Sequence, residues 1–128
     1  MPQRKAKGAE LRVFKGREAR LNRTIFRSLS LQGAQTAYEL HKNVRSVKIL
    51  RGTHYANVKK RVRSLEQLGY VKRIGVRKTK AGFESTVFEM TSRAYLAILM
   101  DSIDFDDLLA RMSEDTANTL MATFATLK

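Results

Sequence analysis

Residues 52–73 constrain the fold of this chain most, because they combine a helix start, an apolar stripe, a basic face and a glycine stop. Thr53 is the predicted N-cap, since a threonine hydroxyl accepts a hydrogen bond from a free backbone N–H of the first turn. Gly69 is predicted to end the helix, because glycine readily adopts the left-handed conformation needed there. About four helical turns fit between these two residues.

The predicted helix has two unlike sides. Residues at steps of three and four share one side of an α-helix, and here they are the apolar Tyr55, Val58, Val62 and Leu65. The opposite side consists of Ala56, Asn57, Lys60, Arg63, Ser64 and Gln67, with Lys59 and Arg61 on its flanks. Amide, hydroxyl and basic side chains of this kind contact bases and phosphates in a DNA major groove. A solvated basic surface is the alternative.

Charge is segregated along the chain. The 128 residues include 25 Lys and Arg against 12 Asp and Glu, a formal net charge of +13. Residues 1–80 carry 22 of the cations and 4 of the anions, a net charge of +18, whereas residues 81–128 carry 3 and 8, a net charge of −5. A basic segment joined to an acidic one indicates a surface for a polyanion and a separate surface kept away from it. Nucleic acid is the favoured polyanion.

Length and composition limit the class of protein. A chain of 128 residues with 43% hydrophobic content is expected to form one domain with a modest core. No apolar run approaches the ~18 residues of a membrane span, and the first residues lack the hydrophobic segment of a signal peptide. We therefore expect a cytoplasmic, nucleoid-associated protein that does not contact membranes.

Catalytic and metal-binding motifs are missing from the sequence. The chain has no cysteine, which excludes disulfides, thiolate metal sites and cysteine nucleophiles. The two histidines, His41 and His54, do not have zinc-site spacing, and no P-loop, GxSxG or GxGxxG motif is present. We expect neither an enzyme nor a bound cofactor or metal.

Two segments precede the capped helices. Residues 1–17 are basic and interrupted by glycines, and are predicted to form a flexible arm that could reach along phosphates or into a minor groove. Residues 18–31 are predicted to be a helix that ends before Gly33. Its apolar side consists of Leu21, Ile25, Phe26 and Leu29.

Thr36 and Glu39 have the spacing of a capping box, in which each side chain accepts a hydrogen bond from the other residue's backbone N–H. A short helix is predicted from here to about residues 41–44. Because a helix N-terminus attracts anions, Gln35 and Thr36 are predicted to contact phosphate. The connection over residues 45–52 is longer than the turn of an ordinary helix-turn-helix, and is expected to add a turn packed on the core.

A β-hairpin is predicted after Gly69. Residues 70–78 and 83–90 are rich in β-branched and aromatic side chains, and residues 79–82 join them. The hairpin carries Arg73, Arg77, Lys78 and Lys80, which are predicted mainly to neutralise phosphates. An edge hairpin that uses lysines to prevent aggregation is the alternative.

Three local motifs carry a resemblance to a known superfamily. They are Thr-Ala-Tyr-Glu-Leu at residues 36–40, Val-x-x-x-Val-x-x-Leu-Glu-x-x-Gly-Tyr-Val at residues 58–71, and Phe-Glu-Met-Thr-Ser-Arg-Ala-Tyr at residues 88–95. In this order the chain resembles the winged helix-turn-helix transcriptional regulators of bacteria and archaea, of the MarR/PadR-like kind, over roughly residues 18–100. Ala94 stands where those regulators usually have glycine. The resemblance implies an α+β, mostly α, winged helix-turn-helix fold and DNA binding.

The C-terminal segment carries more apolar residues than a small winged domain can cover. Helices are predicted over residues 91–101 and 105–127. Their apolar residues are Tyr95, Ile98, Leu99, Leu108, Leu109, Met112, Leu120, Met121, Phe124 and Leu127. Terminal helices form a twofold dimer interface in the regulators that the chain resembles, so a homodimer is expected. Packing of these helices on their own domain is the alternative.

Four aspartates near the start of the second predicted helix, at positions 101, 104, 106 and 107, could suggest a metal site. Their spacing does not match an EF-hand loop, and Asp104 is placed to cap the helix. We predict a capping role.

The sequence therefore predicts a homodimeric, DNA-binding transcriptional regulator with a basic arm (1–17), a winged helix-turn-helix (18–90) and C-terminal dimerisation helices (91–128). Its predicted DNA-binding residues are Gln35, Thr36, Thr53, Asn57, Lys59, Lys60, Arg61, Arg63, Ser64, Arg73, Arg77, Lys78 and Lys80. Of these, Asn57, Lys60, Arg63 and Ser64 are expected at base edges. A winged-helix protein that binds RNA or the ribosome, a non-specific chromatin-type protein and a protein–protein adaptor are the alternatives.

Overall fold

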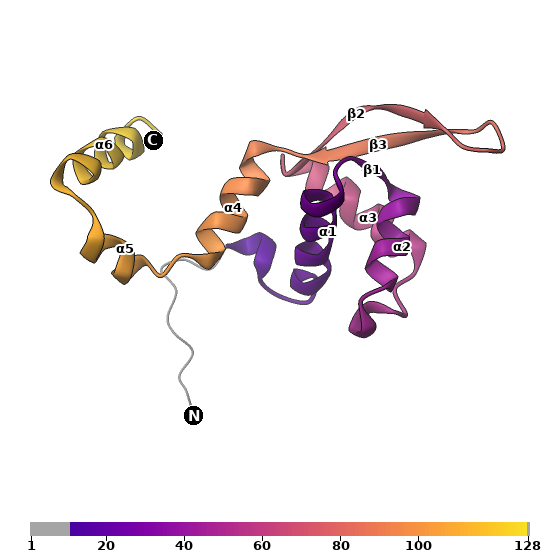
Figure 1. The fold of residues 1–128 in the computed structure, drawn as a ribbon, viewed down its shortest axis with the longest axis horizontal. Coiled ribbons are helices and arrows are strands. Elements are labelled where there is room, and N and C mark those ends of the chain that lie inside the picture. Colours follow the sequence, from indigo (N-terminus) through magenta and orange to yellow (C-terminus); the bar gives the residue numbers. More distant parts are fainter. Residues whose placement is uncertain (1–10, 128) are drawn as a thin grey trace.

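The computed structural model describes residues 11–127, which form a packed body (residues 11–102) and a tail (residues 103–127) that extends away from it (Figure 1). The elements are η1 (Arg12–Phe14), α1 (Ala19–Gln32), β1 (Gln35–Thr36), α2 (Ala37–Arg45), η2 (Lys48–Leu50), α3 (Tyr55–Gln67), β2 (Val71–Lys78), β3 (Glu84–Met90), α4 (Ser92–Ser102), α5 (Phe105–Arg111) and α6 (Glu114–Ala125). Three helices and a small antiparallel sheet in this order make a winged helix-turn-helix, which confirms the predicted fold class.

The sheet has three strands in the order β1-β3-β2. The predicted hairpin of β2 and β3 is present, and its long arm, the wing, extends past α2 (Figure 1). A bulge at Ile74 shifts the register between Arg73 and Gly75. The sequence did not predict β1, in which Gln35 pairs with Phe88, because two residues have no readable periodicity.

The core lies between α1, α2, α3 and the sheet. Its fully buried large side chains are Ile25, Phe26, Leu40, Val44, Val58, Val62, Leu65 and Val71. The apolar stripe predicted on α3 is thus confirmed for its last three members. The prediction is wrong for the first member, Tyr55, because 40% of this residue is exposed.

Residues 11–17 belong to the body and not to a flexible arm. Val13 and Phe14 are buried in the core, where the ring of Phe14 meets that of Phe26 edge-on with their centroids 5.7 Å apart. Asn22 Nδ2 donates a hydrogen bond to the carbonyl oxygen of Val13 at 2.9 Å. The predicted arm is therefore wrong over residues 11–17, and its first ten residues lie outside the described part of the chain.

The capping box at the start of α2 is confirmed. The backbone N–H of Glu39 donates to Thr36 Oγ1 at 3.1 Å, and the backbone N–H of Thr36 donates to Glu39 Oε1 at 2.9 Å. The connection after α2 contains the predicted extra turn, η2. Of the apolar residues in this connection, only Leu50 packs against the core, whereas Val47 and Ile49 are exposed.

The start of α3 differs from the prediction by one residue. The N-cap is His54, not Thr53, and the His54 carbonyl accepts the hydrogen bonds of the first turn. The carbonyl of Thr53 instead accepts a hydrogen bond from His41 Nε2 at 2.9 Å. The end of the helix is as predicted, because Gly69 has a φ of +87°.

A side chain of α4 also approaches Gly69 too closely to leave room for a Cβ. A Cβ at this position would lie 2.7 Å from Arg93 Nη1, and that guanidinium donates a hydrogen bond to the Leu68 carbonyl at 2.7 Å. Thr91 caps α4 and donates through its hydroxyl to the Gly69 carbonyl at 2.6 Å. The motif at residues 88–95 thus runs from the end of β3 into α4, and the methyl group of Ala94 is fully buried there.

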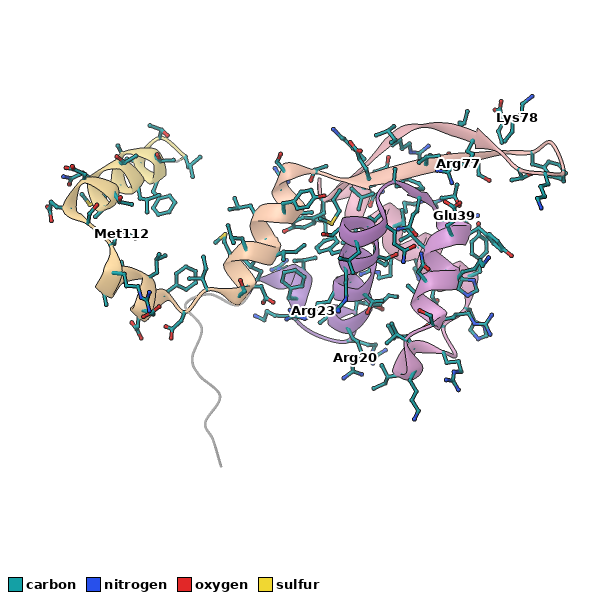
Figure 2. The ribbon with its side chains drawn as sticks, viewed as in Figure 1. Arg20, Arg23, Glu39, Arg77, Lys78 and Met112 are labelled. Atoms are coloured by element: carbon teal, nitrogen blue, oxygen red, sulfur yellow. The ribbon has the colours of Figure 1, made fainter. Side chains whose placement is uncertain are left out.

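The tail contains two helices instead of the single one predicted over residues 105–127. The chain bends at Met112, and Ser113 Oγ then caps α6 by accepting from the Thr116 N–H at 3.1 Å (Figure 2). Asp104 caps α5 as predicted. No residue of α5 or α6 is buried, so the tail does not pack on its own body.

Across residues 11–127, no helix is both long and apolar enough to cross a membrane. The same residues contain no cluster of three or more histidine or carboxylate side chains that could hold a metal ion.

Candidate nucleic-acid interface

The outer side of α3 is polar and largely cationic. The buried side chains of Val58, Val62 and Leu65 fix the rotation of the helix about its axis, so the opposite side faces away from the core. Asn57, Lys59, Lys60 and Arg63 are exposed, and Arg61 and Ser64 are half-buried at its edges. The predicted recognition residues therefore share one accessible surface, which can contact a groove without disturbing the core.

The wing adds a second cationic surface. Lys78 and Lys80 are exposed near the turn that joins β2 to β3, and Figure 2 shows Lys78 on the outer part of the wing. The turn is ordered by hydrogen bonds from the Thr79 N–H to the Phe83 carbonyl at 2.7 Å, and from the Phe83 N–H to Thr79 Oγ1 at 3.2 Å. The two lysines therefore place positive charge at the outer end of an ordered hairpin.

Arg77 lies in an ion pair that connects the wing to α2. Its guanidinium donates to both carboxylate oxygens of Glu39, at 2.7 Å to Oε1, and Figure 2 shows the two side chains facing each other. Burial acts to raise the pKa of Glu39, but hydrogen bonds from the Thr36 backbone and from Arg77 outweigh it. The pKa of Glu39 therefore lies below its ordinary value.

Arg73 makes the equivalent connection between the wing and α3. Its Nε donates to Glu66 Oε2 at 2.7 Å, and its guanidinium lies 6.0 Å from the centroid of the Phe88 ring. The hydrogen bond and the charge of Glu66 raise the pKa of Arg73. Both arginines that the sequence assigned to phosphates are thus engaged in fixing the wing to the helices.

Gln35 and Thr36 do not reach the surface as predicted. Both are buried, and Gln35 Nε2 donates to the Ser28 carbonyl at 2.9 Å while its Oε1 accepts from Asn43 Nδ2 at 2.6 Å. A phosphate contact by these side chains is therefore wrong, because it would break satisfied buried hydrogen bonds. Thr53 is half-buried between η2 and α3.

The structure brings together two tyrosines that sequence reasoning did not assign to the interface. Tyr38 of α2 and Tyr55 of α3 have ring centroids 6.3 Å apart and are 60% and 40% exposed. Each is followed four positions later by a lysine, Lys42 or Lys59, whose ammonium group lies over the ring. This repeated Tyr-x-x-x-Lys spacing was the available signal, because residues four apart share one side of a helix.

These tyrosines border a hollow of about 270 Å³ between α2, α3 and the wing. Lys59 and Arg63 from α3, together with Ser85 and Thr86 from β3, also line it. The helix α3, the start of α2 and the wing therefore meet at one concave, polar surface.

No protein-family model and no curated protein matches this chain. Among solved structures, that of transcriptional regulator PA4135 aligns with 81% of this chain and with 72% of its own, at 22% identity and a TM-score of 0.42.

Proposed function

We propose that this protein is a transcriptional regulator that binds double-stranded DNA, with α3 in the major groove and the wing on the backbone or in the adjacent minor groove. The observation that carries the proposal is the accessible side of α3, where Asn57, Lys60 and Arg63 project from a helix fixed by the core. Residues 1–80 carry a net charge of +18, which suits a polyanion.

The side chains of α3 divide between bases and phosphates. Lys60 and Arg63 suit the acceptor atoms of guanine, and Asn57 suits adenine, while Ser64 is at the edge of the same surface. The flanking Lys59 and Arg61 contact phosphates, as do Lys78 and Lys80 of the wing.

Arg73 and Arg77 have a different task in this proposal. Their carboxylate partners on α3 and α2 already neutralise much of their charge, so they position the wing relative to the recognition helix. The wing lysines then reach the DNA at a fixed distance from α3.

The test is a selection of duplex sites from a random library, followed by fluorescence anisotropy on the selected site and on a scrambled duplex. A regulator prefers its selected site by about 10³-fold or more. Enrichment of no sequence, together with equal affinities for both duplexes, would contradict the proposal and favour a non-specific chromatin-type protein.

We also propose that the regulator is a homodimer formed through its tail. Leu109, Met121, Phe124 and Leu127 are exposed, although their spacing is that of helix sides that normally become buried. A second copy supplies the missing surface, and a twofold dimer presents two α3 helices to a pseudo-palindromic site.

A groove of about 500 Å³ between α1 and α4 suits the tail of a second copy. Phe14, Phe26 and Ile98 give it apolar walls, and Arg20, Arg23 and Arg27 add positive charge to its lining. Figure 2 shows Arg20 and Arg23 near each other at α1. Arg23 pairs with Asp101 of α4. The tail combines apolar side chains with the carboxylates of Asp106, Asp107, Glu114 and Asp115, so its chemistry complements that of the groove.

Sedimentation equilibrium tests the dimer. The full chain is expected to be dimeric at micromolar concentration, and Leu109→Glu or Phe124→Glu to be monomeric, because each places a charge in the apolar contact. Ile49→Glu on η2 is the control, since Ile49 is 62% exposed and lies outside the tail and the groove. A monomeric wild type, or tail variants that stay dimeric, would contradict this arrangement.

A further inference from the structure

Tyr38 and Tyr55, the tyrosine pair, come from the beginnings of α2 and α3. Their rings meet nearly edge-to-face, with an interplanar angle of 71°. The exposed fractions of 60% and 40% leave a large aromatic area in water, so the needs of the core do not account for the two rings. The pair lies beside the proposed recognition surface and lines the hollow between α2, α3 and the wing.

A lysine accompanies each ring. Lys42 Nζ lies 5.9 Å from the ring centroid of Tyr38, and Lys59 Nζ lies 5.4 Å from that of Tyr55. Both distances are within the range of a cation–π interaction. Each lysine is thereby held close to a tyrosine, so that an ammonium group and a phenolic hydroxyl group are available at one place.

The nearby carboxylates do not neutralise these lysines. Glu39 is paired with Arg77 and Glu66 with Arg73. Glu84 also lines the hollow, but it is an exposed side chain of β3 and is paired with neither lysine. Among the ion pairs of residues 11–127, none involves Lys42 or Lys59. The surface around the tyrosine pair therefore keeps positive charge for an anion from outside the chain.

His41 helps to hold Tyr55 in place. Its ring centroid lies 5.6 Å from that of Tyr55, while its Nε2 is hydrogen-bonded to the Thr53 carbonyl oxygen just before α3. The tyrosine at the start of α3 is thus flanked by Tyr38 on one side and by a tethered imidazole on another. Such fixed side chains lose little conformational entropy when a ligand binds.

We infer that the tyrosine pair and its two lysines form a phosphate-binding site for the DNA backbone, in which the tyrosine hydroxyls donate hydrogen bonds to phosphate oxygens. The inference rests on the proposed function, because α3 in a major groove brings the beginnings of α2 and α3 towards the flanking strand. Tyrosine hydroxyls are ordinary donors to DNA phosphates, and a hydrogen bond to an ionised acceptor is stronger than a neutral one.

The geometry favours phosphate over an unpaired base. A base would need an open ring face for stacking. Here the two rings are steeply inclined to each other, and Lys42 and Lys59 lie over ring faces of Tyr38 and Tyr55. The hydroxyls and ammonium groups are the accessible chemistry, and both are complementary to a phosphate oxygen.

Removal of the hydroxyl groups alone tests the inference. Tyr38→Phe and Tyr55→Phe keep the rings, and anisotropy is measured on the selected duplex and on its scrambled version. Each variant is expected to bind both duplexes about tenfold more weakly, since one hydrogen bond to a charged group is lost and phosphates carry no sequence information. Tyr95→Phe is the matched control, because Tyr95 is 52% exposed but lies on α4, and its affinity should not change.

Two results would overturn the phosphate site. Wild-type affinity in both phenylalanine variants would show that the hydroxyls are unused. Wild-type affinity in Tyr38→Phe with a loss in Tyr38→Ala would assign the ring to stacking. In either case the wild type still binds duplex DNA, so the proposed function stands, whereas a wild type that binds no duplex would overturn both.

Discussion

The body and the tail show two fates of amphipathic helices in one chain. In the body, the apolar sides of α1, α2 and α3 meet in a core whose largest side chains are fully buried. In the tail, α5 and α6 have apolar side chains and well-formed caps, but they bury no residue. Both helices lie away from the body (Figure 1). An apolar stripe therefore predicts that a helix side becomes buried, but it does not predict which chain supplies the partner.

The body and the tail also differ in charge. The tail has five carboxylates and one arginine, whereas the first 80 residues have a net charge of +18. Within the body, the carboxylates of Glu39 and Glu66 are engaged by wing arginines, which keeps them from opposing a bound polyanion. The body thus presents its lysines outward, and the acidic tail is expected to avoid the same polyanion.

The largest expected difference between the two regions is in stability. Phe26→Ala should lower the free energy of unfolding by about 3–5 kcal/mol, because Phe26 is 1% exposed and its removal leaves a cavity in the core. Urea unfolding followed by circular dichroism measures this loss, which should be independent of protein concentration. Phe124→Ala in the tail should cost less than about 0.5 kcal/mol in the monomer, and more only at concentrations where the dimer forms. Equal losses at high dilution would contradict the comparison.

Next in size are the effects of α3 on DNA binding. Lys60→Ala or Arg63→Ala should weaken binding to the selected duplex by about 1–3 kcal/mol and relax its specificity. Lys78→Ala on the wing should weaken the selected and scrambled duplexes alike, because a phosphate contact carries no sequence information. Anisotropy titrations of all three variants on both duplexes give the comparison. The same loss on both duplexes for every variant would reject the division between bases and phosphates.

A smaller effect is expected from the capping box. Thr36→Ala should cost about 1 kcal/mol of stability, because the Glu39 N–H loses its acceptor at the start of α2. Thr53→Ala is the matched control one helix later, since the Thr53 side chain does not cap α3. Its change should stay within about 0.5 kcal/mol in the same urea experiment. A larger loss in Thr53→Ala than in Thr36→Ala would reverse the assignment of the two threonines.

The smallest effect concerns the ion pair between the wing and α2. Glu39→Gln should cost about 0.5 kcal/mol near neutral pH, because the pair is largely exposed to solvent. The pKa of Glu39 is lower in the folded protein than its ordinary value of 4.5, so the contribution is complete above pH 4.5 and is lost as the pH falls through the lowered pKa. Unfolding of both proteins from pH 7 to pH 3 should therefore show curves that converge in acid. A gap that widens in acid would contradict the pair.

Much of the fold could be predicted because its signals are local. The spacing of Val58, Val62 and Leu65 gave the buried side of α3, and the Thr36 and Glu39 pair gave the start of α2. The two segments rich in β-branched and aromatic residues after Gly69 predicted the hairpin. Each of these signals depends on residues a few positions apart, where helix and strand geometry leave little choice.

The features that the sequence did not predict depend on contacts between residues far apart in the chain, or on one or two residues. Arg77 bonds to a carboxylate 38 positions away, so its role in positioning the wing could not be read from local spacing. Val13 and Phe14 are two apolar residues in a basic segment, too few to show a helix or strand periodicity. Both are nevertheless buried in the core. Tyr55 is the first residue of α3, and its ring contacts Tyr38 on another helix, which sequence spacing within α3 does not show.

The hypothesis that α3 and the wing bind duplex DNA is best tested by fluorescence anisotropy. The full chain is titrated against a DNA duplex and an RNA duplex of matching sequence, at several salt concentrations. Tighter binding to the DNA duplex is expected, with log K falling steeply and linearly against log salt as the lysines displace counterions. Tighter binding to the RNA duplex, or no salt-dependent binding to either, would contradict it.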